Sequence, residues 1–466
     1  MITQIDAKAI DVNCEALGVP IEKLMANAGK ALYDVLNKGF SGKRILIVCG
    51  LGNNGGDGFA CAKHFGKKAN VALLFPPDQI KSAAARYHFE ELDKKPMMFS
   101  DAHLDQYDVI LDCVLGMGAR SPLSGPYKDY IKRLKDFKGA VVATDVPTGF
   151  GTKDRLIPHT TVTFHDKKSG MTEENCGKIV IADIGIPKDA LYCVGPGDML
   201  RYPVPEEESH KGENGRLLVI GGGPYFGAPA ISAMAAYRVG VDLVHVAAPK
   251  RCIPPMAAQS PMFILHETSD EGHILEQDVK RLLELAKLAD AVLIGPGLGT
   301  SEDTMAAVRE FVLRCDRPLV VDADAITAIA NMAVVRGDIM ITPHKKEFER
   351  ISGFALKSCD LIEVSKKKNL AMLVKGRTDV IVHGDKKKIN NTGTAAMTVG
   401  GTGDVLSGAV AGLLSKGMSL FDAACLGAYI CGVAGEKAFE AFSYGMIATD
   451  VTDMIPKVLK DHLDRR

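Results

Sequence analysis

The stretch Arg44-Ile-Leu-Ile-Val-Cys-Gly-Leu-Gly-Asn-Asn-Gly-Gly-Asp-Gly58 decides the fold of the first half of the chain. An apolar run typical of a buried strand is followed by five glycines among the nine residues from Gly50 to Gly58. Glycines let the backbone approach a ligand closely, and the N–H groups at the start of the next helix would then face a phosphate. A tight turn alone would not need Asn53, Asn54 and Asp57 as well. The stretch therefore predicts a nucleotide site between a strand and a helix.

The first half continues with the same alternation of strands and helices. Continuously apolar strands that alternate with amphipathic helices are typical of a parallel sheet covered on both faces. An α/β domain with a doubly wound sheet is therefore predicted. Strands are expected over 44–49, 71–75, 109–112 and 140–144, and helices over 79–92 and 127–137.

The second half has its own set of strands and helices and is predicted to be a second α/β domain. Strands are expected over 216–220, 243–247, 291–294, 319–322, 340–341, 371–374 and 380–383, and helices over 228–239, 275–288, 304–315, 405–414 and 421–442. The segment from Arg201 to Gly212 is proline-rich, acidic and aperiodic, which is typical of a linker. We place the boundary near residue 207, giving domains 1–207 and 208–466.

Composition excludes several classes of protein. The 56 basic and 57 acidic side chains give a net charge of −1, so no nucleic-acid or membrane partner is expected. No apolar run approaches the roughly 18 residues that a membrane-spanning helix needs. The eleven cysteines are odd in number and contain no Cys-x-x-Cys pair, which indicates a reducing cytoplasm. No His-Glu-x-x-His motif is present, so no zinc site is expected.

Two aspartates of the first half stand at strand ends. Asp112 ends one expected strand and Asp145 directly follows another, at the edge where open α/β sheets hold their ligands. Either aspartate alone could equally be a strand-end cap, but with the glycine loop they converge on one crevice. Asn54, Asp112 and Thr148 offer hard oxygen ligands, which suit an alkali or alkaline-earth ion.

The strongest motif of the second half is Val399-Gly-Gly-Thr-Gly-Asp-Val-Leu-Ser-Gly408. Three glycines in four residues at the start of an apolar helix predict an anion hole made of backbone N–H groups. Asp404 is placed to take the proton of a hydroxyl whose oxygen attacks phosphorus. The alternative is a helix-capping aspartate after a flexible loop, although a cap does not need three glycines.

Other segments of the second half also end buried strands. Gly295-Pro-Gly-Leu-Gly299 and Thr342-Pro-His-Lys-Lys-Glu347 follow strands directly, and Gly227-Ala-Pro-Ala230 opens a helix. Lys375 could belong to the same sheet edge or could be a solvated lysine, and His344 could be a strand-end histidine without a ligand. Lys386-Lys387-Lys388 is predicted to be a solvated hairpin turn.

Together these motifs closely resemble the bifunctional NAD(P)H-hydrate repair enzymes over nearly the whole chain. The resemblance implies an NAD(P)H-hydrate epimerase with a Rossmann-like fold in the first half. It implies an ADP- or ATP-dependent NAD(P)H-hydrate dehydratase with a ribokinase-like fold in the second. The first half carries the resemblance in Ile5–Gly29, Asn53–Asp57, Asp145–Gly149, Thr161–Phe164 and Asp183–Pro187.

The resemblance also implies roles for residues of the first half. Asn54, Asp112 and Thr148 would hold a potassium ion, with Thr148 in place of the usual serine. Met25-Ala-Asn departs from the usual Met-Glu-Asn. Asp145 is our candidate for proton transfer. Contacts with the hydrated nucleotide are implied for Asn53, Asn54, Gly55, Gly56, Asp57, Gly116, Met117, Gly118, Ala119, Arg120, Ser121, Pro122, Tyr127 and Asp145.

For the second half, the resemblance places the hydrated substrate at Ala228, Gly299, His344 and Asp404. Lys345-Lys346 replaces the usual Pro-Gly after His344, so the shape of that loop is open. ADP or ATP, with Mg²⁺, would contact Met372, Leu373, Val374, Lys375, Gly376, Thr394, Ala395, Ala396, Met397, Thr398, Val399, Gly400, Gly401, Thr402 and Gly403.

Such an enzyme would interconvert the R- and S-forms of hydrated NAD(P)H and dehydrate the S-form at the expense of ADP or ATP. Phosphorylation of the ring hydroxyl, with Asp404 as base and Mg²⁺ countering charge, would turn a poor leaving group into an expellable phosphate. The resemblance favours ADP as donor and a homo-oligomer in the cytoplasm that acts on small molecules.

Two alternatives remain open from the residues alone. A ribokinase-type small-molecule kinase would use Asp404 and release a stable phosphorylated product, but it would not need a first half with its own nucleotide loop. The first half could instead be a nonenzymatic nucleotide-sensing module. The intact Asn54, Asp57, Asp112 and Asp145 argue against a binding-only module, which need not keep every carboxylate.

Overall fold

The computed structural model describes residues 1–118, 122–330, 332 and 336–464. By its contacts the chain divides into two compact units, Met1–Leu191 and Tyr192–Arg466. The sequence placed the boundary near residue 207, but the segment before that position packs on the second unit. The Val194 backbone N–H donates to the Ile389 carbonyl at 2.8 Å, and the Tyr202 hydroxyl donates to the Val239 carbonyl at 3.0 Å.

The first unit is built on a seven-stranded sheet in the order β3-β2-β1-β4-β5-β6-β7. Every described pairing in it is parallel, and the chain winds outward from β1 in both directions. The strands are β1 (Ile45–Cys49), β2 (Asn70–Leu73), β3 (Met97–Met98), β4 (Val109–Cys113), β5 (Ala140–Thr144), β6 (Thr160–Phe164) and β7 (Lys178–Ala182).

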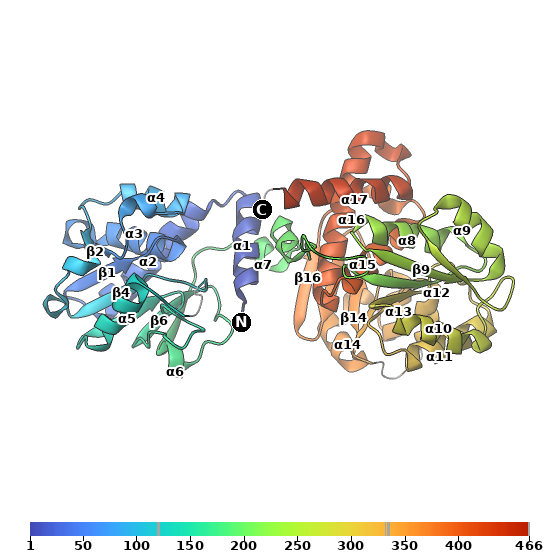
Figure 1. Ribbon diagram of the computed structural model, residues 1–466, viewed down its shortest axis with the longest axis horizontal. Helices are drawn as coiled ribbons and strands as arrows, with labels where there is room; N and C mark the ends of the chain where they lie inside the picture. The colour runs from blue at the N-terminus through green and yellow to red at the C-terminus, as the bar shows by residue number, and fades with distance from the viewer. Residues whose placement is uncertain (119–121, 331, 333–335, 465–466) are drawn as a thin grey trace. The chain divides into compact units, whose positions relative to one another are not determined.

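Helices cover both faces of this sheet, because its strands alternate apolar side chains between two cores (Figure 1). Ile47 and Cys49 face the core shared with α2 and α3, whereas Leu46 and Val48 face the core shared with α5. The helices are α1 (Gln4–Ala16), α2 (Ile21–Gly39), α3 (Asn53–Phe65), α4 (Ala83–Glu90), α5 (Pro126–Lys135), α6 (Glu173–Cys176) and α7 (Lys188–Tyr192).

The second unit is built on a nine-stranded sheet in the order β10-β9-β8-β11-β12-β13-β14-β15-β16. The strands from β10 to β14 run parallel, and β15 and β16 are antiparallel additions at one edge. They are β8 (Arg216–Ile220), β9 (Leu243–Ala248), β10 (Ile264–Glu267), β11 (Ala291–Ile294), β12 (Leu319–Val321), β13 (Ile339–Ile341), β14 (Ala371–Val374), β15 (Asp379–His383) and β16 (Lys386–Asn390).

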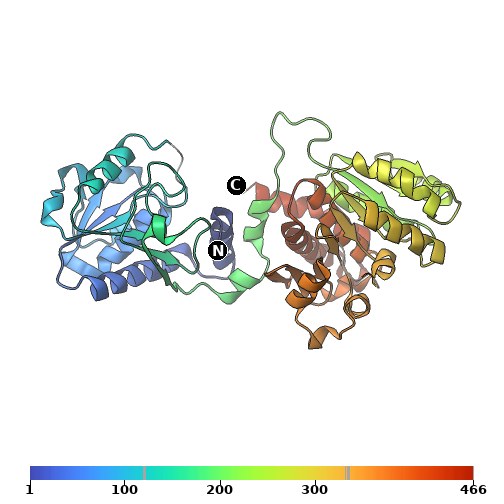
Figure 2. The ribbon, with the colours of Figure 1, turned by 90° about the horizontal axis from the view of Figure 1, so that it is seen from below.

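Helices also cover both faces of the second sheet (Figure 2). On one face, glycines let α15 approach α8 closely: a Cβ on Gly408 would lie 2.2 Å from the Ser232 carbonyl oxygen. The helices are α8 (Gly227–Arg238), α9 (Ile253–Gln259), α10 (Val279–Lys287), α11 (Glu302–Arg314), α12 (Asp324–Ile329), α13 (Lys345–Ser352), α14 (Leu361–Lys368), α15 (Thr402–Ser415), α16 (Leu420–Phe442) and α17 (Ala448–Leu463).

The predicted strands of both halves are confirmed to within a residue or two at their ends. The prediction for Lys386-Lys387-Lys388 was wrong, because these residues open strand β16 rather than forming a turn. Lys388 is drawn into the fold by the buried Asp198, whose Oδ1 lies 2.6 Å from its Nζ. Among the described helices, none combines the length and the apolar character needed to cross a bilayer.

Candidate active sites

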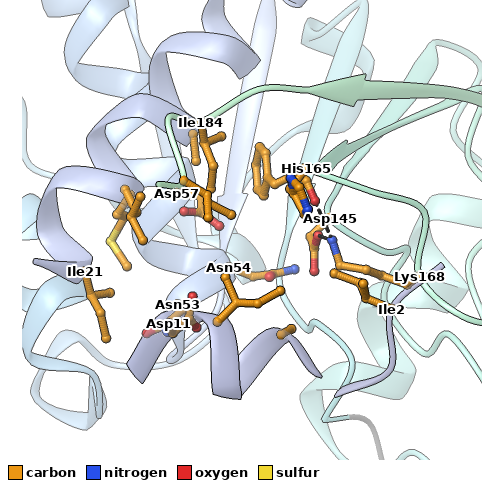
Figure 3. A pocket seen from close by; sticks show the side chains of 17 residues that line it. Ile2, Asp11, Ile21, Asn53, Asn54, Asp57, Asp145, His165, Lys168 and Ile184 are labelled. Atoms are coloured by element: carbon orange, nitrogen blue, oxygen red, sulfur yellow. Dashed lines mark hydrogen bonds and ion pairs between the residues drawn. The ribbon is translucent and has the colours of Figure 1, made fainter. Parts of the chain in front are cut away.

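The first unit has a pocket at the carboxyl ends of its central strands, where the sequence predicted a crevice (Figure 3). Helix α1, helix α2, the start of α3 and the segments that follow β5 and β6 provide its walls. Its polar lining combines carboxylates, amides and one ammonium group from Asp11, Asn53, Asn54, Asp57, Asp145, His165 and Lys168.

The glycine loop after β1 is shaped by close contacts between backbone segments. A Cβ on Gly50 would lie 1.9 Å from the Val114 carbonyl oxygen, and one on Gly55 would lie 2.2 Å from the Gly50 carbonyl oxygen. A side chain at either position would displace backbone. Two of the expected substrate residues, Gly55 and Gly56, are therefore glycines for packing reasons, since a Cβ on Gly56 would meet the Met25 sulfur at 2.3 Å.

A buried group of oxygen atoms lies behind this loop. Asp112 is 1% exposed, and its carboxylate accepts hydrogen bonds from the Thr148 hydroxyl (2.7 Å), the Thr148 backbone N–H (2.9 Å) and the Tyr130 hydroxyl (3.1 Å). Burial raises the pKa of Asp112, although these hydrogen bonds oppose the shift. Asn54 donates through Nδ2 to the Thr144 carbonyl at 3.0 Å. Asp112 and Thr148 are thus in direct contact, and Asn54, in the first turn of α3, is tied to the neighbouring strand end at Thr144.

Asp145 faces the pocket from the turn after β5 and forms an ion pair with a buried lysine. Its φ of 60° is a left-handed conformation that aspartate adopts more readily than most residues. Lys168 is 3% exposed, and its Nζ lies 2.6 Å from Asp145 Oδ1. The same Nζ donates to the Thr163 hydroxyl and the Phe164 carbonyl, both at 3.0 Å. Lys168 is therefore fixed in place beside the carboxylate.

Two further carboxyl groups share this pocket with Asp145. Burial, the charge of Asp145 and the charge of Glu15 raise the pKa of Asp11 to about 6, and Lys168 opposes the shift. Burial, followed by the charges of Asp145 and Asp11, raises the pKa of Asp57 well above its usual value. The pocket therefore holds carboxyl groups that differ in how readily they ionise.

The expected contacts of the first half are partly brought together. Asn53, Asn54, Asp57 and Asp145 line the pocket, and Gly116 lies against Asn54, since a Cβ there would be 2.9 Å from Asn54 Oδ1. The remaining expected residues, Met117, Gly118, Pro122 and Tyr127, are absent from the pocket lining, and Ala119, Arg120 and Ser121 lie outside the described residues.

Sequence analysis missed Asp11, His165 and Lys168. His165 and Lys168 follow β6 as Asp145 follows β5, so the strand-end rule would have found them if it had been applied to that strand. Asp11 lies in the middle of α1, and nothing in the local sequence of a helix indicates which distant strand ends it will face.

The second unit gathers its charged groups at the carboxyl ends of β12, β13 and β14. Asp322 directly follows β12 and is 1% exposed, and its Oδ1 accepts from Lys375 Nζ at 2.9 Å and from the Thr342 hydroxyl at 2.7 Å. Burial alone would lower the pKa of Lys375, but the charge and hydrogen bond of Asp322, together with the charges of Glu347 and Asp404, outweigh burial and the pKa is raised. Lys375 is therefore an ion-paired residue of the site and not a solvated lysine.

Asp404 lies in the first turn of α15, directly after the last glycine of the loop. The N-cap of α15 is Gly401, with a φ of 96°, so Asp404 is not the capping residue of that helix. Burial raises the pKa of Asp404 to about 7; the charges of Asp322 and Asp324 add to this shift and Lys375 opposes it. A carboxyl group that titrates near neutral pH suits proton transfer.

The loop after β13 keeps its helix start despite the two lysines. The His344 ring accepts the backbone N–H of Lys346 at 3.1 Å, and Glu347 accepts the His344 backbone N–H at 2.8 Å. These reciprocal hydrogen bonds form a capping box at the start of α13. His344 thus acts as a helix cap, and its partly exposed ring faces solvent beside the site.

The expected nucleotide contacts divide into two groups. Lys375, Gly376, Thr394, Met397, Thr402 and Gly403 line one pocket. Strand β14 contains Met372, Leu373 and Val374, whose side chains are buried in the core of the unit. These side chains therefore support the pocket without lining it. Ala395, Ala396 and Thr398 belong to the short helix beside it, and Val399, Gly400 and Gly401 lead from that helix into α15.

This pocket has walls that the sequence did not indicate. Asp379, Asn390 and Thr392 line it from the antiparallel edge of the sheet, with Asn390 Nδ2 donating to Asp379 Oδ2 at 3.1 Å. Helix α16 closes it through Gly432, where a Cβ would lie 1.9 Å from the Thr392 hydroxyl oxygen.

Two expected substrate residues of the second half lie near the same edge. The Gly299 backbone N–H donates to Asp324 Oδ2 at 2.8 Å, which ties the loop after β11 to the residues after β12. Ala228 is in the first turn of α8, whose Ile231 lies within 3.1 Å of a Cβ built on Gly401. Helix packing therefore brings the start of α8 to the glycine loop of α15.

Comparison with protein families gives two matches that divide the chain as the structure does. A family described as NAD(P)H-hydrate dehydratase matches residues 217–457, which is more than half of the chain. A family described as YjeF-related protein N-terminus matches residues 21–170.

Curated relatives match over the whole chain. The bifunctional NAD(P)H-hydrate repair enzyme Nnr of Methanothermobacter thermautotrophicus is 39% identical, over 98% of this chain and 94% of its own length. The enzyme of the same name from Archaeoglobus fulgidus is 35% identical, over 98% of both chains. Both halves of this chain therefore have counterparts in single proteins.

Solved structures confirm the fold of the second half. An ADP/ATP-dependent NAD(P)H-hydrate dehydratase from Bacillus subtilis, co-crystallised with ATP/Mg²⁺, is 26% identical with a TM-score of 0.52. It covers 58% of this chain and 98% of its own. A ribokinase-like superfamily protein from Enterococcus faecalis, 22% identical with a TM-score of 0.53, shows the same fold. The expected ribokinase-like and Rossmann-like α/β folds are confirmed.

Proposed function

The chain belongs to the bifunctional NAD(P)H-hydrate repair enzymes, and we propose that each of its two sites carries one of the two activities. The pocket of the first unit is assigned to epimerisation of the hydrated nicotinamide ring. The charged edge of the second unit, with its nucleotide pocket, is assigned to dehydration. The observation that carries this division is that each unit has its own aspartate–lysine pair, with one partner buried, at the carboxyl ends of its strands.

In the first unit, we assign proton transfer to Asp145. Its carboxylate faces the pocket, and Lys168 at 2.6 Å supplies the opposite charge that a buried carboxylate needs. Asn53, Asn54 and Asp57 offer amide and carboxyl groups to the polar parts of the substrate from the start of α3. The glycine loop excludes side chains, so that the substrate can approach the backbone N–H groups.

The residues behind the loop fit a potassium ion. Each hydrogen bond described at Asp112 comes from a neutral donor, namely Thr148, Tyr130 or the Val114 backbone. A buried carboxylate with neutral donors keeps an uncompensated charge, which a monovalent cation would offset. Asn54, Asp112 and Thr148 would hold the ion through oxygen atoms. When bound, it would supply positive charge that steadies the loop and the substrate's polar groups.

In the second unit, we propose that Asp404 accepts the proton of the substrate hydroxyl as its oxygen attacks the terminal phosphorus of ADP or ATP. The P–O bond to the nucleotide breaks, and the phosphorylated hydroxyl then leaves as inorganic phosphate while the ring loses a proton and regains its double bond. The paired Lys375 lies 3.5 Å from a Cβ built on Gly403, so its positive charge stands at the anion hole of α15. That charge favours the transferring phosphoryl group.

The site of the second unit also fits a magnesium ion carried by the nucleotide. Three aspartates meet here, and the charges of Asp322 and Asp324 add to the effect of burial in raising the pKa of Asp404. Mg²⁺ is usually bound through one or two carboxylates together with nucleotide phosphates, and the described residues contain no cluster of three metal-binding side chains, so Asp322 or Asp324 would hold it with the phosphates. It would offset their charge and that of the phosphates. The Bacillus subtilis relative, co-crystallised with ATP/Mg²⁺, supports the assignment of Mg²⁺ to this site. Of the two nucleotides, we expect ADP to be the preferred donor.

The two alternative functions are not favoured. A small-molecule kinase with a nucleotide-sensing module would not be expected to match bifunctional repair enzymes over 98% of its length. The family also supports action on small molecules in the cytoplasm, and we propose a homo-oligomer there.

The direct test uses a purified mixture of the two hydrate epimers, with Mg²⁺, K⁺ and either ADP or ATP. Complete recovery of the reduced-nicotinamide absorbance is expected, and the faster nucleotide identifies the donor. Recovery that stops when the S-form is exhausted would contradict the assignment of the first pocket to epimerisation. No recovery with either nucleotide would contradict the assignment of the second site to dehydration, and the small-molecule kinase would again be the favoured function.

A further inference from the structure

The N-terminal helix places a carboxyl group in the epimerase pocket, on a side that no strand reaches. Ile2 pairs with the segment that carries Lys168: the Ile2 backbone N–H donates to the Lys167 carbonyl, and the Ser169 N–H donates to the Ile2 carbonyl, both at 2.9 Å. Thr3 then caps α1. The pairing anchors α1 against the pocket, so that Asp11 lines it together with Ile10 and Ala7.

Asp11 and Asp145 stand on different sides of this pocket. Figure 3 shows the Asp145–Lys168 pair on one side and Asp11, on α1, away from it with the cavity between them. Asp145 is paired with an ammonium group at 2.6 Å, whereas the charges around Asp11 are mainly those of other carboxylates. The two groups therefore differ in charge environment as well as in position.

The chemistry of the substrate calls for two such groups. Water adds to an enamine so that the hydroxyl goes to the carbon next to the nitrogen, and epimerisation must invert that carbon. If the hydroxyl departs from one face of the ring and water returns to the other, a proton must be given on the first face and taken on the second. Pairs of carboxyl groups with different environments are how one site supplies an acid and a base.

We propose that Asp11 is the second acid–base residue of the epimerase site, acting across the pocket from Asp145. This proposal rests on the assignment of Asp145 to proton transfer above. The Asp11 carboxyl gives its proton to the ring hydroxyl, and the C–O bond breaks with its electron pair leaving on water. The ring nitrogen's lone pair forms a C=N⁺ bond to the same carbon.

Water on the opposite face then adds to that carbon, and the C=N⁺ electron pair returns to nitrogen. The added water gives a proton to the Asp145 carboxylate, so one proton has left Asp11 and one has reached Asp145. Exchange with solvent restores both groups. The other epimer reacts by the same steps in reverse order, with Asp145 as the donor and Asp11 as the acceptor.

Asp57 is less suited to this role, although it shares the pocket. It is 8% exposed within the first turns of α3, where it is more enclosed than Asp11, and burial raises its pKa well above its usual value. A group that cycles must both give and take a proton near the working pH, as the pKa of about 6 allows Asp11 to do. Asp57 is therefore assigned to hydrogen bonding with the substrate.

The first experiment compares Asp11→Asn with the unaltered full-length chain. Interconversion of separated R- and S-hydrates is followed by chromatography with K⁺ present and ADP and ATP absent, so that dehydration does not run. Loss of one acid–base group is expected to slow interconversion by about 100-fold or more. Glu90→Gln is the matched control, because Glu90 is an exposed carboxylate at the end of α4 that does not line the pocket, and it is expected to change the rate less than twofold.

Two more readouts separate a chemical role from a structural one. Asp11→Glu keeps a carboxyl group and is expected to retain a measurable rate and a limb of the pH–rate profile near pH 6, which Asp11→Asn loses. In water enriched in ¹⁸O, each inversion by the unaltered enzyme is expected to place one solvent oxygen on the ring. Inversion without incorporation would overturn the proposed departure and return of water.

The outcomes distinguish this proposal from the assignment of Asp145. Slow interconversion in both Asp11→Asn and Asp145→Asn, with normal substrate KM and thermal unfolding, supports the two-residue site. An unchanged rate in Asp11→Asn with a large loss in Asp145→Asn overturns the role of Asp11 and leaves that of Asp145 standing. Unchanged rates in both variants overturn both assignments.

Discussion

The two sites of the molecule use the same kinds of side chain in different arrangements. Each brings three aspartates and an ion-paired lysine to the carboxyl ends of parallel strands, among the residues that the structure describes. In the first site, Lys168 pairs with Asp145, the residue assigned to proton transfer. In the second site, Lys375 pairs with Asp322, and the aspartate assigned to proton transfer, Asp404, forms no ion pair with the residues that the structure describes and has a pKa of about 7. The choice of partner for the lysine therefore separates a carboxylate with a fixed counter-charge from one that titrates near neutral pH.

Of the changes that test this comparison, removal of Lys168 should have the largest effect on stability and on epimerisation. Lys168→Met leaves the half-buried Asp145 beside Thr163 without its counter-charge, so we expect a loss towards the lower end of the roughly 3–5 kcal/mol that breaking a fully buried pair from one side costs. Thermal or denaturant unfolding of the first unit should show this loss, together with loss of epimerisation. Lys63→Met is the control, because Lys63 forms an exposed pair with Glu91 that should contribute about 1 kcal/mol or less. Equal losses in the two variants would contradict a special role for Lys168.

The pH dependence of dehydration tests the other side of the comparison. Asp404 must be ionised to accept a proton, so kcat/KM for the S-hydrate should rise with pH through about 7 and fall about tenfold per pH unit below it. The raised pKa also means that ionising Asp404 costs folded stability as pH rises towards 7. Asp404→Asn should therefore unfold at a higher temperature than the unaltered chain at pH 8. A flat profile between pH 5 and 8 would be incompatible with Asp404 as the base.

Potassium should affect epimerisation but not dehydration, and changes at the proposed ion site should have a smaller effect than the two changes above. Thr148→Val removes the hydroxyl that donates to Asp112 at 2.7 Å. We expect the K⁺ concentration for half-maximal epimerisation to rise about tenfold or more, because losing a ligand or its hydrogen bond costs roughly 1.4 kcal/mol or more. Thr148→Ser keeps the hydroxyl and should stay within about threefold on the same scale. Dehydration of the S-form should not respond to either change. An unaltered K⁺ dependence in Thr148→Val would remove Thr148 from the proposed ion site.

The smallest effect is expected for the two lysines after His344. The capping box of α13 uses the His344 ring and the Glu347 side chain, and neither lysine side chain takes part in it. Proline is well accepted at the first position of a helix, so the double change Lys345→Pro and Lys346→Gly should shift stability by about 1 kcal/mol or less. Thermal unfolding and the S-hydrate rate measure this. A large loss of dehydration would show that the lysines themselves contact the substrate.

Much of the fold could be predicted because the strands are continuously apolar and end in recognisable loops. The loops at Gly50 and Gly400, and the aspartates at 112, 145 and 404, follow strands or open helices in the sequence itself. Pairings between distant segments could not be predicted in this way. Neither the contact of Lys168 with Asp145 nor that of Lys388 with Asp198 has a local signal, since each depends on which loops the sheet order brings together. The place of Asp11 depends likewise on how Ile2 anchors α1.

The central claim is that Asp145 and Asp404 carry separate activities in one chain. It is tested most directly by Asp145→Asn and Asp404→Asn in the full-length protein, each assayed for interconversion of the epimers and for nucleotide-dependent dehydration of the pure S-form. We predict that Asp404→Asn loses dehydration by about 100-fold or more and keeps interconversion, and that Asp145→Asn shows the reverse pattern. Either variant losing both activities while folded, or keeping both, would contradict the account.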